Sequence, residues 1–246
     1  MKSVAAFTIL DSVDSTNNYA MAQLHAGLAI HGSAWFTNDQ FGGKGQRGKK
    51  WLGQAGEGIA LSITIVPRRE FGVYPFILNT VVANCCRQFL HENLKLPAAI
   101  KWPNDLYLRD RKAGVILIEN NFRQNTWKWA VLGIGMNVNQ LHFDPALPNP
   151  VSFKQLTGQE YDVEALAREL QQCIMAKIDD PALNPDKELE TYNLHLYKKE
   201  EEVTLKKQNA AFKTFIKKVN RSGQLITEDT MERAFEFGEV EWVIAS

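Results

Sequence analysis

The chain has 246 residues, of which 45% are hydrophobic and 23% charged, which suits one large or two unequal globular domains. Its 28 basic and 28 acidic residues cancel, which argues against the basic excess that non-specific nucleic-acid binding requires. The three cysteines form neither a disulfide framework nor a metal-binding spacing, as in proteins of a reducing compartment. No apolar run approaches the roughly 20 residues of a membrane span, and no signal peptide is evident, so we expect a soluble cytoplasmic protein.

The N-terminal part of the chain is predicted to consist of short strands with two helices between them. Residues 14–17 offer N-cap side chains for a helix that runs to about His25. Apolar residues at helical spacing predict a second helix over 74–93, with Cys85 and Cys86 among its core residues. A polar turn is expected at 109–112. Strands are predicted at residues 7–10, 33–38, 59–65, 100–102, 106–108, 114–119 and 127–134.

The C-terminal part changes character after about residue 190. A proline-rich loop at 144–150, an amphipathic helix at 162–178 and a helix from Pro185 to about His195 come first. Short strands then follow at residues 202–206, 212–220, 224–227, 231–237 and 239–244. The periodicity therefore predicts an α/β protein of the α+β kind with a small all-β tail. We place the first domain at residues 1–190 and the second at residues 191–246.

Residues 42–51 form the most informative stretch, because four glycines and four cations share ten positions. Glycine lets backbone N–H groups approach a ligand closely, and lysine and arginine supply charge for a phosphate or carboxylate. The stretch satisfies two generic phosphate-binding patterns, but both require a helix directly after the last glycine. More glycines and then an alternating strand follow instead, so a Rossmann site and a P-loop are excluded. A solvated basic surface loop remains the alternative for this segment alone.

Three further segments carry unusual polar residues. Residues 101–105 place a lysine, an amide and a carboxylate around a proline, which breaks strand pairing and lets these side chains be aimed. Residues 133–139 are glycine-spaced and end in amides, and residues 15–17 are Ser-Thr-Asn. Each also has a structural interpretation: an edge strand ending in a turn, a bulged strand end and a helix cap, respectively.

Taken in this order and at these intervals, the segments resemble the biotin protein ligases over nearly the whole chain, including the β tail. The resemblance implies a mixed, largely antiparallel sheet with helices mainly on one face, followed by a small SH3-like β-barrel. It also implies the activity biotin–[biotin carboxyl-carrier protein] ligase. Biotin's carboxylate would attack the α-phosphate of ATP, with Mg²⁺ on the phosphates, to give biotinyl-5′-AMP and pyrophosphate. A lysine of a biotin carboxyl carrier protein, an acetyl-CoA carboxylase subunit, would then take the biotin and release AMP.

The resemblance places the polar head of biotin near the N-terminus, with the glycine-rich loop closing over it. Lys101 is expected to be the essential cation, bridging the biotin carboxylate and the α-phosphate, while Lys44 and Arg47 meet the phosphates. Trp51 would pack the closed loop onto the biotin tail. The residues expected in the loop and around biotin are Ser15, Thr16, Asn17, Gln40, Gly43, Lys44, Gly45, Gln46, Arg47, Gly48, Trp51, Gly114 and Ile116.

The resemblance also assigns residues to the nucleotide. Asn104 and Asp105 are expected to orient phosphate and metal, with Asp105 the candidate Mg²⁺ ligand. Asn137 would read the adenine edge, and Phe153, after the proline loop, would cover the adenine face.

The chain departs from the family pattern in two places. The common loop reads Gly-Arg-Gly-Arg-Arg-Gly, whereas here Lys44 and Gln46 replace the first two arginines. Gln46 loses a charge that helps to retain the adenylate in the family, which predicts a faster loss of biotinyl-AMP. The second departure is the start of the sequence at the first catalytic strand, without the helix-turn-helix domain of bifunctional members. A monofunctional ligase without repressor activity is therefore expected.

Two other functions remain open at this stage. A lipoate or octanoate ligase or transferase of the related fold is the nearest alternative, although its Arg-Arg near a Gly-Gly-Gly run is absent here. A non-catalytic biotin or nucleotide sensor is the other, and it would not need an aligned cation such as Lys101. The protein is expected to act as a monomer or homodimer without nucleic-acid or membrane partners.

Overall fold

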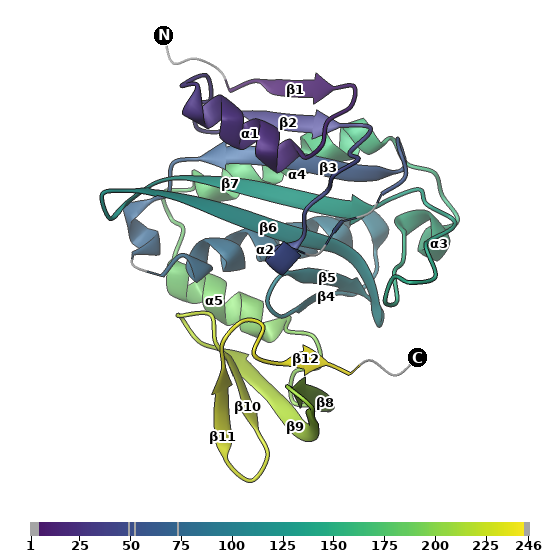
Figure 1. Ribbon diagram of the computed structural model, residues 1–246, viewed down its shortest axis with the longest axis vertical. Coiled ribbons are helices and arrows are strands. Elements are labelled where there is room, and N and C mark those ends of the chain that lie inside the picture. Colours follow the sequence, from purple (N-terminus) through teal and green to yellow (C-terminus); the bar gives the residue numbers. More distant parts are fainter. Residues whose placement is uncertain (1–4, 49, 52, 73, 244–246) are drawn as a thin grey trace.

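The computed structural model describes residues 5–48, 50–51, 53–72 and 74–243, and it contains two sheets (Figure 1). The larger sheet has seven strands in the order β1-β2-β3-β7-β6-β5-β4. Its first two strands pair in parallel, and the remaining neighbours pair antiparallel. The strands are β1 (Phe7–Leu10), β2 (Ala34–Thr37), β3 (Gly58–Ile65), β4 (Ala98–Lys101), β5 (Asp105–Leu108), β6 (Arg111–Arg123) and β7 (Thr126–Asn137).

Helices α2 and α4 pack on one face of this sheet, with α5 against α2, while α1 lies on the other face (Figure 1). Two of these helices begin at a side-chain cap: Asp162 accepts a hydrogen bond from the N–H of Ala165 at the start of α4, and Asn184 accepts from two N–H groups at the start of α5. This confirms the expectation of helices mainly on one face. The helices are α1 (Thr16–His25), α2 (Phe76–Leu94), α3 (Phe153–Thr157), α4 (Val163–Ile178) and α5 (Pro185–Leu194).

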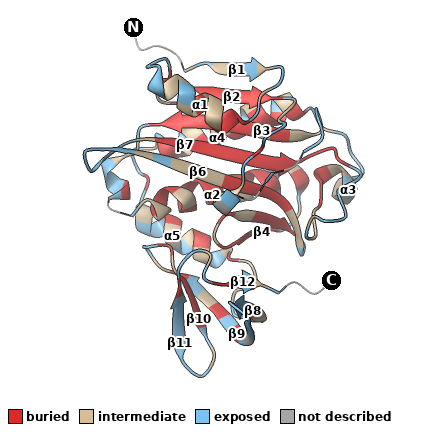
Figure 2. Cartoon of the chain, viewed as in Figure 1, coloured by how far each residue is buried: buried red, intermediate tan, exposed pale blue. Residues whose placement is uncertain are grey.

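Strand β3 shows how the two faces of the sheet differ. Its isoleucines and leucine at alternate positions are buried in the large core with α2 and α4. The residues between them, Ala60, Ser62 and Thr64, face the side of the sheet that carries α1. Figure 2 shows that the centre of the sheet is buried and that the end of the β6–β7 hairpin is exposed. The α1 face therefore carries small and polar side chains in a buried setting.

The C-terminal residues form a separate antiparallel sheet in the order β11-β10-β9-β8-β12. It lies beyond α5, next to β4 and β5 at the edge of the main sheet (Figure 1). The predicted all-β tail is confirmed, although the predicted strand at 239–244 is shorter and its end lies outside the described residues. The strands are β8 (Glu202–Lys207), β9 (Ala210–Val219), β10 (Leu225–Glu228), β11 (Glu232–Phe235) and β12 (Glu241–Trp242).

The β6–β7 hairpin is longer than the sequence indicated. The predicted turn at 109–112 is limited to its first half, since β6 already begins at Arg111. At the other end the hairpin continues to Gln124 and Asn125, whose positive φ angles of 48° and 59° form a tight two-residue turn.

In the described part of the chain, no helix is long and apolar enough to cross a membrane.

Candidate functional site

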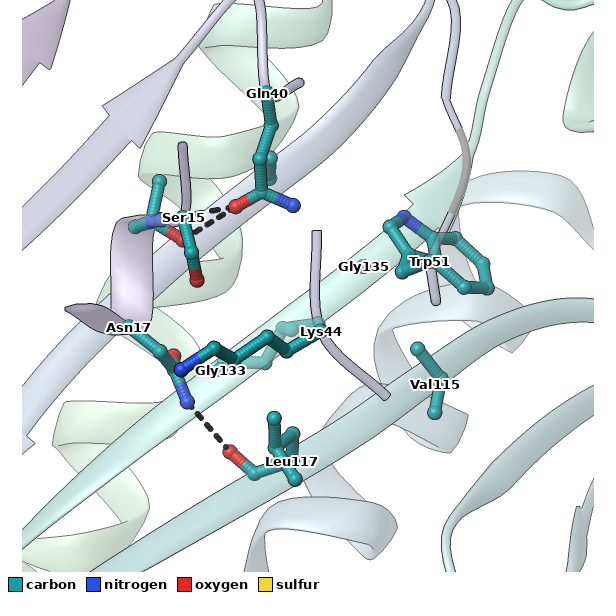
Figure 3. Close-up of a pocket in the computed structure, with 12 residues that line it drawn as sticks. Ser15, Asn17, Gln40, Lys44, Trp51, Val115, Leu117, Gly133 and Gly135 are labelled. Atoms are coloured by element: carbon teal, nitrogen blue, oxygen red, sulfur yellow. Dashed lines mark hydrogen bonds between the residues drawn. The ribbon is translucent and has the colours of Figure 1, made fainter. Parts of the chain in front are cut away.

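A pocket opens on the α1 face, above the centre of the sheet (Figure 3). Its floor is formed by neighbouring positions of three strands, with Ala60 opposite Gly135 and Gly135 opposite Val115. The glycines of β7 make this space. A Cβ on Gly133 would lie 2.3 Å from Oδ1 of Asn17, and one on Gly135 would lie 2.6 Å from the ring of Trp51. The glycines therefore leave room for the side chains of Asn17 and Trp51 above an apolar floor.

One end of the pocket is polar, and its side chains are buried. Ser15, Thr16 and Asn17 are only 2%, 4% and 3% exposed. Oε1 of Gln40 accepts hydrogen bonds from the backbone N–H of Thr16 at 2.9 Å and from its hydroxyl at 3.2 Å. Ser15 occupies the N-cap position of α1 without a side-chain capping bond, and it lines the pocket instead. Helix capping alone does not account for this segment.

Ser62 on β3 completes this polar end. Its hydroxyl lies 2.6 Å from Oδ1 of Asn17 and 2.8 Å from Oγ1 of Thr16, but it has only one hydrogen to donate. Asn17 in turn donates to Oε2 of Glu119 at 2.7 Å. The cluster thus has more acceptor oxygens than donors, and it suits a ligand that brings N–H groups. Ser62 and Glu119 were not predicted from the sequence.

The glycine-rich loop folds back over the pocket. The N–H of Trp51 donates to the carbonyl of Gly43 at 2.9 Å, and a Cβ on Gly43 would lie 2.3 Å from the Trp51 carbonyl oxygen. The side chain of Lys44 extends across the pocket (Figure 3). Its Nζ donates to Oδ1 of Asn18 at 2.6 Å. The next residues, Gln46–Gly48, form a turn of 3₁₀-helix. The loop is thus part of the site and not a separate surface feature.

Gln46 and Arg47 both lie in this turn of the loop. The backbone of Arg47 belongs to this turn, but its side chain lies outside the described residues. The side-chain oxygen of Gln46 is buried and has no hydrogen-bond partner within the described part of the chain. Gly45 and Gly48 lie on either side of these residues.

Lys101 lies at the end of β4, two strands away from the pocket floor, and it is only 8% exposed. Its Nζ donates to the hydroxyl of Tyr107 at 3.2 Å and lies 5.1 Å from the centre of that ring. The ring of Trp242 from the second sheet lies 5.3 Å from the same Nζ. Burial raises the pKa of Tyr107, so its hydroxyl keeps its proton at neutral pH. Lys101 is therefore a buried cation held between two aromatic rings.

An ion pair lies between Lys101 and the pocket. Nζ of Lys112 is 2.6 Å from Oδ1 of Asp105 and 5.9 Å from the centre of the Trp51 ring. Lys112 was not predicted, and nothing in its sequence context distinguished it from the other lysines. Asn104 links β5 to β6, since its amide donates to the carbonyl of Ile116 and its own carbonyl accepts from the Ile116 N–H.

The expected magnesium site has little support from side chains. Asp105 is already paired with Lys112. In the described ranges no three His, Cys, Asp or Glu side chains gather closely enough to hold a metal ion. The described side chains therefore form no protein cage for Mg²⁺ around Asp105.

Four further predicted residues, besides Lys101, Asn104 and Asp105, do not line the pocket. The structure brings Val115 and Leu117 to the pocket, whereas Gly114 faces core side chains and Ile116 belongs to the core on the helical face. Asn137 is buried and donates to the carbonyl of Val151 at 3.2 Å. Phe153 is fully buried against Tyr161, so its ring is not open to an adenine.

Comparison with known proteins gives the family. The sequence model of the Biotin/lipoate A/B protein ligase family matches residues 9–137, which is more than half of the chain. The chain belongs to this family. Among curated relatives, the bifunctional ligase/repressor BirA of Escherichia coli is 30% identical over 145 residues, covering 57% of this chain and 43% of that protein. The biotin–[acetyl-CoA-carboxylase] ligase of Paracoccus denitrificans is 34% identical over 167 residues, covering 63% and 66%.

Solved structures agree on the fold of this family member. The biotin protein ligase of Aquifex aeolicus in complex with biotin and ATP has a TM-score of 0.80 at 21% identity, with 97% of this chain and 99% of that chain covered. At that identity the likeness concerns the fold alone. The chain spans 43% and 40% of the length of the bifunctional ligase/repressors BirA of Escherichia coli and Salmonella typhimurium, respectively.

Proposed function

We propose that this family member is a biotin protein ligase, which activates biotin with ATP and transfers it to a lysine of a carrier protein. The acceptor-rich end of the pocket carries this proposal. The ureido ring of biotin has two N–H donors, and the cluster around Ser62 and Asn17 has acceptor oxygens to receive them. The apolar floor formed by β3, β7 and β6 suits the remaining hydrocarbon of the ligand.

The first step is an attack by the biotin carboxylate oxygen on the α-phosphorus of ATP. A bond forms between the carboxylate oxygen and the α-phosphorus. The bond from the α-phosphorus to the oxygen that bridges to the β-phosphate breaks, and pyrophosphate leaves with its electron pair. Negative charge grows on oxygens throughout, which fixed cations stabilise. Lys101 is the proposed cation for the reacting oxygens, and Lys44, at the loop, is the proposed contact of the phosphates. The Arg47 assignment rests on the resemblance.

The second step transfers biotin to the carrier. The amine of a carrier lysine attacks the acyl carbon of biotinyl-AMP, an amide forms, and AMP leaves as the phosphate oxygen takes the electron pair. The names of the Paracoccus denitrificans and Mycobacterium tuberculosis relatives point to acetyl-CoA carboxylase as the target. We therefore propose the biotin carboxyl carrier protein as the partner of this chain.

We further propose that Mg²⁺ arrives with the phosphates of ATP, because the described side chains form no cage for it. When bound it would neutralise phosphate charge. The neutral net charge supports an enzyme without a nucleic-acid partner. A cytoplasmic location and a monomeric or homodimeric state are part of the same proposal.

Lipoate activation is the second candidate, since the family includes lipoate ligases. The dithiolane ring of lipoate has no N–H donor, so it would leave the acceptors around Asn17 and Thr16 unused. Thermal shift with biotin and with lipoate, together with pyrophosphate release from ATP, separates the two candidates. Biotin should stabilise the protein and drive pyrophosphate release. Release driven by lipoate alone would favour the second candidate.

Replacing Ser62 by alanine should weaken biotin binding by roughly tenfold, the cost of disturbing one buried hydrogen-bond network of about 1–3 kcal/mol. The loss follows because Ser62 orients both Asn17 and Thr16. Isothermal titration with biotin measures it. The matched control is Ser33→Ala, which removes a buried hydroxyl that bonds the Ile30 N–H outside the pocket. If both variants bound biotin with the affinity of the wild type, the cluster around Ser62 would not bind the ligand.

Replacing Gln46 by arginine should slow the escape of biotinyl-AMP, because the loop regains the charge that the family pattern has at this position. The buried oxygen of Gln46 accepts no hydrogen bond from the described residues, so the substitution removes none there. Release of the labelled intermediate, followed by rapid filtration without carrier, gives the rate. The same rate in the wild type and the Gln46→Arg variant would refute a role for this position in retention.

A further inference from the structure

The segment that carries Lys101 is in contact with the second sheet. Trp102, directly after Lys101, is buried, and its indole N–H donates to the carbonyl of Gly223 at 2.9 Å. Its ring meets Phe237 edge-on, with centroids 6.0 Å apart. These two contacts come from different parts of the C-terminal residues. The reactive segment is therefore supported from outside the main sheet.

Lys101 itself is contacted by Trp242 on β12. Its Nζ lies 5.3 Å from the Trp242 ring and 5.1 Å from the Tyr107 ring, both within the reach of a cation–π interaction. Tyr197 stands beside the pair, with its ring 4.7 Å from Tyr107 and 5.9 Å from Trp242. The aromatic group thus surrounds one ammonium with rings from both sheets.

The environment of the indole N–H of Trp242 is also unusual. This N–H is buried, and it has no hydrogen-bond partner among the residues that the structure describes. A buried donor without a partner costs free energy, so its place next to Lys101 calls for a reason beyond packing. The reason is that this orientation places the face of the Trp242 ring toward the ammonium of Lys101.

Trp242 is not needed simply to join the two sheets. Residues of the connection already bond to β4, since the Ile100 N–H donates to the carbonyl of His195 at 2.9 Å and the Tyr197 N–H to that of Ile100 at 2.8 Å. Asn193 also exchanges hydrogen bonds with the backbone of Val219, at 2.6 and 2.9 Å. The contact between Trp242 and Lys101 is therefore additional to the attachment.

We propose that Trp242 is a positioning residue for Lys101, through which the C-terminal sheet controls the activation step. The proposal rests on the ligase function proposed above. Its ring holds the ammonium in place where the biotin carboxylate and the α-phosphate meet. The lining of the biotin pocket comes from residues no later than Gly135 among those described. Trp242 should consequently affect the rate of activation and not the binding of biotin.

Full-length Trp242→Leu and Trp242→Phe variants test this, with biotin-dependent pyrophosphate release from ATP as the assay. Leucine removes the ring, and phenylalanine keeps a ring face but no N–H. We expect kcat to fall by roughly tenfold in the Leu variant, with the Phe variant close to the wild type. KM for biotin should be the same in all three proteins. If the Leu variant does not fold, Trp242→Met, flexible and apolar, replaces it.

The matched control is Trp127→Leu, which removes an indole from the β6–β7 hairpin, where it stacks on Phe122. Its kcat should equal that of the wild type. A Leu variant as active as the wild type, or a Phe variant as impaired as the Leu variant, would overturn the role of Trp242. No biotin-dependent release by the wild type would instead reject the ligase function itself, so the two failures are distinguishable.

Discussion

Replacing Lys101 by alanine is expected to reduce biotin-dependent release of pyrophosphate on the order of 100- to 1,000-fold, the typical effect of removing one charge-stabilising group. The side chain is a buried cation, fixed by the hydroxyl of Tyr107 at 3.2 Å and by two aromatic rings. It is thus held in place before the reaction. Biotin affinity should change little, because Lys101 does not belong to the pocket lining.

Pyrophosphate release and biotin titration on the same preparation measure the two quantities for Lys101→Ala. Lys206→Ala serves as the control, since it removes an exposed lysine of the second sheet. Its rate should match the wild type. Retention of normal pyrophosphate release by the Lys101→Ala variant would remove this lysine from the mechanism.

Replacing Gly133 by alanine is expected to weaken biotin binding on the order of tenfold to a hundredfold. The new Cβ would lie 2.3 Å from Oδ1 of Asn17, far inside contact distance. Asn17 is 3% exposed and bonded to Ser62 and Glu119, so it cannot move without breaking this network. Forcing a methyl group into such a packed site costs about 1–3 kcal/mol.

Biotin titration and thermal unfolding of Gly133→Ala separate a local from a global effect. Gly53→Ala adds the same methyl group where no atom lies within 4 Å, and it should leave both measurements unchanged. Normal biotin affinity in Gly133→Ala would mean that the polar end of the pocket is not where biotin binds.

Most helices and strands of the fold could be predicted from the sequence, because hydrophobic periodicity indicates which face of a strand or helix is buried. The alternation of residues 59–65 predicted β3, and the structure shows that one face of this strand lies in the core while Ala60 on the other face lines the pocket. Strand β6 was harder to interpret, since it is buried on both faces around Val115. The pattern there does not say which face holds the ligand. The prediction accordingly named Gly114 and Ile116, whereas their neighbours line the pocket.

The residues that the sequence did not reveal act through partners far away in the chain. Asn17 and Glu119 are 102 positions apart, and Ser62 meets Asn17 across 45 positions. Such pairs depend on strand order and register, which periodicity does not encode. Trp242 is the clearest case, because its meaning depends on how the second sheet sits against β4. Single motifs were visible in the sequence, but the network that supports them was not.

The most direct test of the ligase function is a mass spectrum of a biotin carboxyl carrier domain after incubation with this protein, ATP, Mg²⁺ and equal amounts of biotin and lipoate. The ligase proposal predicts a single adduct of one biotin joined by an amide to the carrier lysine, and none when ATP is omitted. A lipoyl adduct, or an unmodified carrier beside consumed ATP, would contradict it.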